Sequence, residues 1–195
     1  MDALELKKVL LEAVANDWDD GRQYLGMSMI GQCPRKLYYD LVEGRRQPGV
    51  QGVLYCHEGY VHERDVRARL EQMGVEVEEV GKELVAFGGR VQGHIDGMVG
   101  GVLLEVKSVD AHGLENVRDM GAKARHFDQV QAYMHWGGYE RALVVYKERE
   151  SGELWVCEVV RNAEVGQKLE GKAREILAAV DAGEPPECEC GHCRR

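Results

Sequence analysis

Acidic and basic side chains at short spacings in residues 93–107 could bind a metal ion and support hydrolysis. The segment reads GHIDGMVGGVLLEVK, with Asp96 at the end of one apolar run and Glu105 and Lys107 inside the next. Carboxylate oxygens suit hard cations such as Mg²⁺ or Mn²⁺, and a lysine beside such a cation can orient a water molecule or stabilise developing negative charge. Taken alone, the same residues also fit an edge hairpin whose polar side chains are merely solvated.

The hydrophobic pattern indicates how these three side chains could meet. Residues 91–98 and 102–108 each alternate as strands do, and the glycine pair between them is typical of a two-residue hairpin turn. Because side chains two apart share a face of a strand, Glu105 and Lys107 point the same way. If the face that carries Asp96 coincides with theirs, two carboxylates and an ammonium converge. The carboxylates would repel each other unless a metal ion or Lys107 lay close by.

Two predicted helices carry further polar residues at helical spacing. Residues 58–70 read EGYVHERDVRARL and form a helical pattern with His62 near its start. In residues 127–136, Gln129 and Tyr133 are four apart and therefore lie on the same face of a helix. Taken separately, each feature has an ordinary structural explanation, because a single helical histidine or a half-buried polar pair is common.

The order of these segments carries a resemblance to a known family. Between about residues 59 and 146, four segments follow one another in the order GYVHE, GHIDG, LLEVKS and QVQAY. Together they resemble the motifs of RecB-type members of the PD-(D/E)XK nuclease superfamily. The resemblance implies that Lys107 helps to activate the attacking water, and that Gln129 and Tyr133 contact DNA or support the site. It also implies four ligands for Mg²⁺ or Mn²⁺: His62, Asp96, Glu105 and the main-chain carbonyl of Val106.

Cysteines form a second group with metal-binding potential. The chain has six, and the last three fall within ECECGHC near its end. Because no signal peptide or transmembrane run is evident, we expect a cytoplasmic, reducing setting in which a disulfide framework is disfavoured. Clustered thiols in such a setting indicate a metal site, and three close cysteines need a fourth ligand for zinc or an iron–sulfur cluster.

The segment GQCPRKLYYDL offers that fourth ligand. A Cys-Pro-Arg segment paired with a C-terminal cysteine triplet resembles the iron–sulfur branch of these nucleases, which includes the CRISPR-associated RecB-like exonucleases and AddB. The resemblance implies a [4Fe–4S] cluster with four ligands: Cys33, Cys188, Cys190 and Cys193. The triplet is spaced more tightly than is usual in that branch, so Zn²⁺ is the alternative, and His192 could replace one thiolate. We interpret Cys157 as a small core residue. Cys56 fits either role, and we favour a spare thiol near the start of a helix.

The resemblance and the order of the elements indicate an α/β fold, with a restriction-endonuclease-like core in which helices flank a central mixed sheet. The 195 residues suffice for one domain. It would comprise a helical N-terminal region at 1–57, a nuclease core at 58–160, and a closing helix with a Cys-rich tail at 161–195, and the metal cluster would staple the first region to the last. Further expected elements are helices at 1–19 and 163–182, a polar loop at 44–52, and strands at 75–87, 141–147 and 154–160.

The net charge of −9 is unlike that of proteins that coat DNA nonspecifically by neutralising phosphates. Two basic runs could nevertheless line a channel, although such charges are more often simply solvated. The first comprises Arg35, Lys36, Arg45 and Arg46, and the second comprises Lys123 and Arg125. The helix expected at 1–19 has a polar face of mixed sign, so we interpret it as a packing helix and not as a membrane anchor.

Taken with these residues, the resemblance implies a metal-dependent DNA exonuclease that hydrolyses phosphodiester bonds in single-stranded DNA or at DNA ends and leaves a 5′ phosphate. The resemblance implies a role in recombination, repair or CRISPR adaptation, including in a phage, with a homo-oligomer or a complex with proteins of those pathways as compatible assemblies. One alternative is a sequence-specific endonuclease on the same core, although no recognition domain is visible. The other is a noncatalytic DNA-binding scaffold with a structural metal site, against which the complete acid, acid and lysine set argues.

Overall fold

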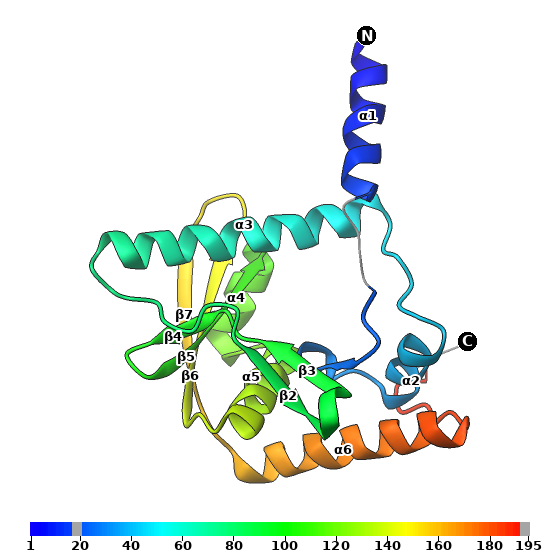
Figure 1. Ribbon diagram of the computed structural model, residues 1–195. Coiled ribbons are helices and arrows are strands. Elements are labelled where there is room, and N and C mark those ends of the chain that lie inside the picture. The colour runs from blue at the N-terminus through cyan, green and yellow to red at the C-terminus, as the bar shows by residue number, and fades with distance from the viewer. Residues whose placement is uncertain (17–20, 192–195) are drawn as a thin grey trace.

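A computed structural model describes residues 1–16 and 21–191, which form an α/β fold built on two sheets (Figure 1). The larger sheet has four strands in the order β4 (Gly97–Val99), β5 (Val102–Val109), β6 (Arg141–Glu148) and β7 (Leu154–Val160). β5 and β6 run parallel, whereas the outer strands pair antiparallel, so this sheet is mixed as expected. The smaller sheet has three strands in the order β1 (Leu25–Gly26), β3 (Val91–His94) and β2 (Glu83–Ala86).

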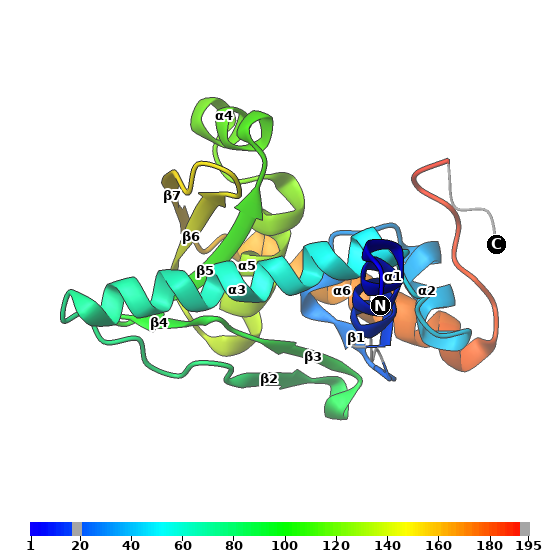
Figure 2. The ribbon, with the colours of Figure 1, turned by 90° about the horizontal axis from the view of Figure 1, so that it is seen from above.

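Helices cover both faces of the larger sheet (Figure 2). α3, Val50–Gln72, crosses one face, where Val66 packs against Leu104, Val106 and Val145. The opposite face and its surroundings are covered by α4 (Ala111–Met120), α5 (Ala124–Gly137) and α6 (Ala163–Ala182). The remaining elements are α1 (Ala3–Asn16), which projects from the body in Figure 1, α2 (Pro34–Val42), and two 3-10 turns, η1 (Met27–Met29) and η2 (Phe87–Gly89).

Local chemistry explains where the helices begin and end. The Asp110 side chain accepts a hydrogen bond from the Gly113 N–H at the start of α4, and Asn162 accepts two at the start of α6. Gly138 and Gly183 adopt left-handed conformations with φ of 73° and 70° directly after α5 and α6. These are the preferred residue types for helix N-caps and C-terminal caps.

The main core lies between the larger sheet and α4, α5 and α6. Leu103, Val130, Val144 and Ile176 meet there from β5, α5, β6 and α6, and each is completely buried. Burial of such a side chain contributes about 1.5–3 kcal/mol. The polar site described below is therefore built on a sheet and helices that share this core.

The expected hairpin is confirmed, because β4 pairs antiparallel with β5 across Gly100 and Gly101, whose φ values are 55° and 77°. Positive φ at both positions is typical of a type I′ turn. The prediction of a single strand at 91–98 is wrong. β3 ends at His94 and β4 begins at Gly97, and the two strands belong to different sheets. The hydrophobic alternation continues through the break, so the pattern alone did not reveal it.

Other element boundaries also differ from the prediction. α3 begins at Val50, so the predicted loop at 44–52 is shorter and the helix predicted at 58–70 is longer. Only Glu83–Ala86 of the region predicted at 75–87 forms a strand, and α4 has no counterpart among the predicted elements. The strands at 141–147 and 154–160 and the closing helix are confirmed. Within the described ranges, no helix combines the length and apolar composition needed to cross a membrane.

Candidate active site

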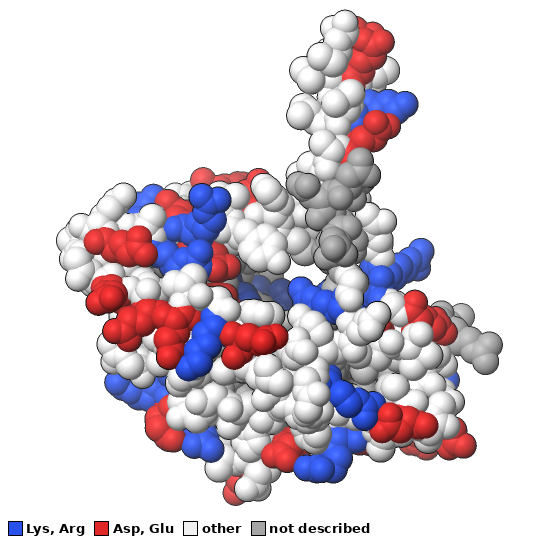
Figure 3. Space-filling model, in the orientation of Figure 1, with Lys and Arg blue, Asp and Glu red and all other residues white. Residues whose placement is uncertain are grey.

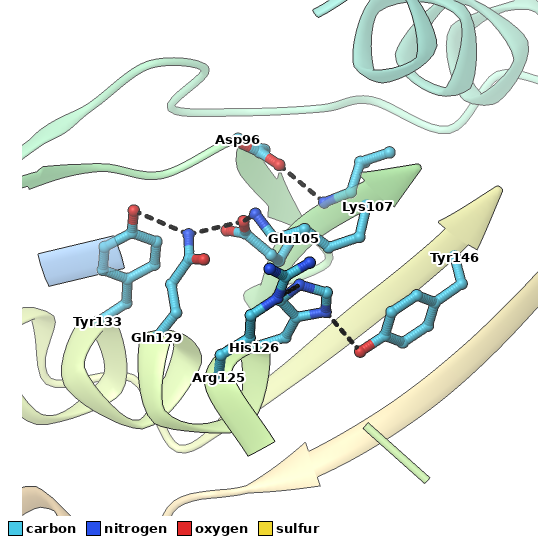
Figure 4. Close-up of polar contacts among 9 residues, drawn as sticks. Asp96, Glu105, Lys107, Arg125, His126, Gln129, Tyr133 and Tyr146 are labelled. Atoms are coloured by element: carbon cyan, nitrogen blue, oxygen red, sulfur yellow. Dashed lines mark hydrogen bonds and ion pairs between the residues drawn. The ribbon is translucent and has the colours of Figure 1, made fainter. Parts of the chain in front are cut away.

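Asp96, Glu105 and Lys107 lie together where the link between the two sheets passes β5 (Figure 4). Asp96 follows β3, and its Oδ2 accepts a hydrogen bond from the Val106 main-chain N–H at 2.7 Å. Glu105 lies in the middle of β5 and is completely buried, and its Oε1 forms an ion pair with Lys107 Nζ. The pairing of β4 with β5 thus places the first acid beside the second.

α5 supports this group from one side. The Gln129 Nε2 donates to Glu105 Oε1 at 2.7 Å and to Tyr133 Oη at 3.1 Å. Tyr133 packs so closely on β3 that a Cβ atom at Gly93 would lie 2.6 Å from its ring. The glycine that opens the GHIDG segment therefore makes room for the tyrosine, and both α5 residues predicted for the site reach it.

Burial and charge shift the acid–base properties of the group. Burial raises the pKa of Asp96 well above its usual value, and repulsion by Glu105 adds to that rise. Burial also raises the pKa of Glu105, although attraction by Lys107 opposes the rise. Burial lowers the pKa of Lys107, but attraction by Glu105 and Asp96 outweighs burial and leaves that pKa raised. One completely buried and one partly buried carboxyl group beside a single ammonium favour the arrival of a further positive charge.

One carboxylate oxygen indicates where such a charge could bind. Glu105 Oε2 is buried, and among the described residues it has no hydrogen-bond partner. An unsatisfied buried carboxylate oxygen is costly, so a ligand at that atom would stabilise the site. Two carboxylates with an oxygen left over are a donor set that fits a hard divalent cation such as Mg²⁺ or Mn²⁺.

The acidic group opens into a cavity of about 810 Å³. Tyr60 of α3, Arg22 and Arg45 of the N-terminal region, and Arg125 of α5 contribute to its walls. Figure 3 shows Lys and Arg side chains in the hollow beneath α3, whereas acidic side chains gather on the surface around the loop after α3. Both basic runs noted in the sequence thus contribute a residue to a hollow with an acidic centre, although the chain as a whole is acidic.

α3 brings Glu63, and not its neighbour His62, to the cavity. The negative charge of Glu63 raises the pKa of both Asp96 and Glu105, after the larger effect of burial. His62 is buried, and its Nδ1 lacks a hydrogen-bond partner within the described part of the chain. Burial and the positive charge of the nearby Lys147 lower the pKa of His62. The charges that act on His62 are therefore different from those that act on Asp96 and Glu105. The proposed ligand role of His62 stays a prediction.

Sequence reasoning missed Glu63 because the histidine beside it matched the family motif. Consecutive residues of a helix point about 100° apart, so only one of the pair can face the cavity. Sequence reasoning also assigned no role to His126, a buried residue of α5 that lines the cavity. Neither residue stands out by type or spacing, since both lie in helices rich in polar residues.

The cysteine group is separate from the acidic group, since none of its three described cysteines lines the cavity. The Sγ atoms of Cys33, Cys188 and Cys190 all lie within 4.8 Å of one another, and those of the last two are 3.7 Å apart. Cys33 directly precedes α2, whereas the other two follow α6, so the group joins the N-terminal region to the tail. Arg35 Nη1 donates to the Pro186 carbonyl at 3.4 Å and adds a second link between these segments.

The other cysteine predictions have different outcomes. Cys193 and His192 lie outside the described residues. Cys157 is buried in β7, and its Sγ lies 3.9 Å from the Val117 carbonyl oxygen, so it is a core residue as predicted. Cys56 is exposed on α3, where it lines the large cavity away from the three clustered thiols.

Comparison with solved structures places this chain in a shared fold. The alkaline exonuclease LHK-Exo from Laribacter hongkongensis has a TM-score of 0.65 and 18% identity, over 83% of this chain and 89% of its own. A phage-related exonuclease from Haemophilus somnus 129PT gives 0.62 and 12%, over 86% and 96%. A putative exonuclease from Eubacterium rectale gives 0.55 and 14%, over 99% and 91%.

These likenesses confirm the restriction-endonuclease-like α/β fold, with mixed sheet and flanking helices, over most of the chain. LHK-Exo has also been solved in complex with dAMP. No protein-family model matches the sequence, and no curated protein is significantly similar to it.

Proposed function

We propose that this chain is a divalent-metal-dependent deoxyribonuclease, and specifically an exonuclease. The observation that carries the proposal is the group of Asp96, Lys107 and the completely buried Glu105, with one Glu105 carboxylate oxygen unsatisfied, at the cavity of a fold shared with exonucleases. The proposed substrate is single-stranded DNA or a DNA end, and the proposed product carries a 5′ phosphate. Recombination, repair and CRISPR adaptation are the settings that fit, in a cytoplasmic protein acting as a homo-oligomer or in a complex.

Each side chain of the site has a different role in the proposed reaction. Asp96, Glu105 and the Val106 carbonyl would hold Mg²⁺ or Mn²⁺, with Glu63 or His62 as a further ligand. Such a cation, when bound, polarises a phosphate and lowers the pKa of a water molecule. Lys107 supplies N–H donors and positive charge beside Glu105, so it can orient the attacking water. Gln129 keeps Glu105 in place and thereby holds the oxygen donors in position.

The three clustered thiols support a second proposal, a structural metal site. Thiolates are soft ligands that suit iron–sulfur clusters or Zn²⁺, and three are already within reach of one another. We propose a [4Fe–4S] cluster held by Cys33, Cys188, Cys190 and Cys193, with Zn²⁺ as the alternative. Anaerobically purified protein that is brown and contains iron supports the cluster, whereas colourless protein that contains zinc supports the alternative.

The nuclease proposal is tested by incubating labelled single-stranded and duplex DNA with Mg²⁺ or Mn²⁺. Wild-type protein should shorten linear strands from an end, Asp96→Ala should not, and Asp119→Ala, which alters an exposed residue of α4, should behave as wild type. Cleavage that survives in Asp96→Ala would refute the site. Cleavage of circular DNA would favour an endonuclease, and binding without any cleavage would favour a scaffold.

A further inference from the structure

Arg125 lies in the first turn of α5, and its neighbour holds its side chain. Arg125 Nε donates to His126 Nε2 at 3.0 Å. His126 Nδ1 lies 3.0 Å from Tyr146 Oη, which also accepts the Lys123 main-chain N–H at 3.1 Å. A continuous series of hydrogen bonds thus runs from β6 through the imidazole to the guanidinium (Figure 4).

The protons in this series can be assigned from chemistry. A guanidinium keeps its protons throughout the accessible pH range, so Arg125 Nε must donate and His126 Nε2 must accept. A neutral imidazole that accepts at Nε2 carries its proton on Nδ1, which then donates to Tyr146 Oη. A hydroxyl oxygen can accept two hydrogen bonds, here one from His126 and one from Lys123. His126 is therefore fixed in one tautomer and one orientation.

Burial keeps the base of this series rigid. His126 is 5% exposed and Tyr146 is completely buried. Burial lowers the pKa of His126 to about 3, and the positive charges of Lys107 and Arg125 contribute to that shift. A neutral ring retains the Nε2 lone pair that binds Arg125, whereas a protonated ring would lose it.

The other end of the series reaches the candidate active site. Arg125 is an exposed residue, and it lines the same cavity as Asp96, Glu105 and Lys107. In Figure 4 its guanidinium extends from the start of α5 toward Glu105 and Lys107. The contact with His126 uses only the Nε–H, so the N–H groups of the two terminal nitrogens can be presented to a ligand. Because Nε is already held, less conformational entropy is lost when a ligand binds.

We propose that Arg125 binds a backbone phosphate of the DNA strand in the cavity, and that His126 is a positioning residue that aims it there. The inference rests on the proposed nuclease function and adds a specific substrate contact to it. A planar guanidinium matches a phosphate through two parallel hydrogen bonds. Its charge also offsets the repulsion that Asp96, Glu105 and Glu63 would exert on a phosphate.

The test measures binding of a fluorescent single-stranded oligonucleotide by anisotropy, with Ca²⁺ in place of Mg²⁺ and with strand integrity checked on a gel. Affinity is recorded between about 50 and 200 mM salt. Arg125→Ala should weaken binding roughly tenfold. It should also reduce the steepness of log K against log salt by about 0.7, the contribution of one phosphate contact on a single strand. Arg64→Ala, which removes an exposed arginine of α3 that does not line the cavity, should change neither quantity.

Two further variants test the positioning role. His126→Gln and His126→Phe should each weaken binding roughly threefold in the presence of Arg125 and have no further effect beside Arg125→Ala, because partners in one network are not additive. If substitution of His126 only destabilised the fold, its effect on binding affinity would add to the loss of affinity caused by Arg125→Ala. Thermal denaturation shows whether each variant is folded. If His126→Phe does not fold, the positioning role is tested with His126→Gln alone.

The outcomes separate this inference from the function on which it rests. Wild-type binding together with an unchanged salt slope in Arg125→Ala would overturn the Arg125 contact and leave the nuclease proposal standing. Additive losses in the double variants would overturn the role of His126. A wild-type protein that neither binds nor cleaves DNA would remove the proposed function, and this inference with it.

Discussion

Gln129 Nε2 lies 2.7 Å from Glu105 Oε1, so a helix on one face of the sheet fixes a carboxylate that projects from β5. The same amide nitrogen donates to Tyr133 at 3.1 Å. Both α5 residues are almost fully buried, and Glu105 is completely buried. The orientation of Glu105 therefore depends on the packing of α5 as well as on the strand.

Replacing Gln129 with leucine should impair catalysis more than stability. The variant loses the donor that orients Glu105, and loss of a partner that supports a metal ligand typically costs about 10–100-fold in activity. Gln131→Leu is the matched control on the same helix, because Gln131 instead bonds the Val160 carbonyl and the Asn162 N–H. It should lower the free energy of unfolding by about 1–3 kcal/mol and leave kcat of the folded protein unchanged. Equal effects of the two variants on kcat would contradict this assignment.

Glu63→Gln and His62→Ala should separate the contributions of two neighbouring residues of α3. Only Glu63 lines the cavity and acts on the charges of Asp96 and Glu105. We expect Glu63→Gln to raise the Mg²⁺ concentration needed for half-maximal activity about tenfold. Glu58→Gln, on an exposed part of the same helix, should leave it unchanged. A metal requirement that shifts in His62→Ala alone would restore His62 as the ligand.

Acid should destabilise the protein partly through His126. An unfolded histidine gains a proton near pH 6.5, whereas folded His126 gains one only near pH 3. Its contribution to stability is therefore complete above pH 6.5 and is lost as pH falls toward 3, by at most about 1.4 kcal/mol per pH unit. In urea denaturation, the stability gap between wild type and His126→Gln should narrow on acidification. His112→Gln, at an exposed position of α4, should follow wild type throughout.

Cys33→Ser should release the structural metal and loosen the link between α2 and the tail. A metal present at 100 times its Kd stabilises the folded state by about 2.7 kcal/mol, so the variant should melt at a lower temperature. A chelator should lower the melting temperature of wild type but have little effect on the variant. Cys56→Ser, outside the thiol group, should keep both metal content and melting temperature. Undiminished metal content in Cys33→Ser would exclude Cys33 as a ligand.

The sequence predicted those parts of the site that depend on local periodicity. Alternation along β5 placed Glu105 and Lys107 on one face, and helical spacing placed Gln129 beside Tyr133, as the hydrogen bonds bear out. The glycine pair predicted the turn that brings Asp96 back to Val106. Each of these relationships joins residues that are at most ten positions apart in the sequence.

Relationships between elements were harder to predict. Rotation of α3 decides whether His62 or Glu63 faces the cavity, and no pattern within GYVHE fixes that rotation. The contact of His126 with Tyr146 joins α5 to β6, a pairing that depends on tertiary packing. α4 was missed because its apolar positions are few, although Asp110 three residues before Gly113 marks its start.

The break between β3 and β4 lies at the candidate active site and separates the two sheets there. Asp96 lies in the two-residue link between the sheets, whereas Glu105 lies inside a strand of the larger one. The separation of the two acids therefore depends on the position of one sheet relative to the other. Ile95, which is 1% exposed, is buried next to Asp96 and holds the link in place. A small displacement of the three-stranded sheet relative to the four-stranded sheet would therefore change the distance between the carboxylates of Asp96 and Glu105.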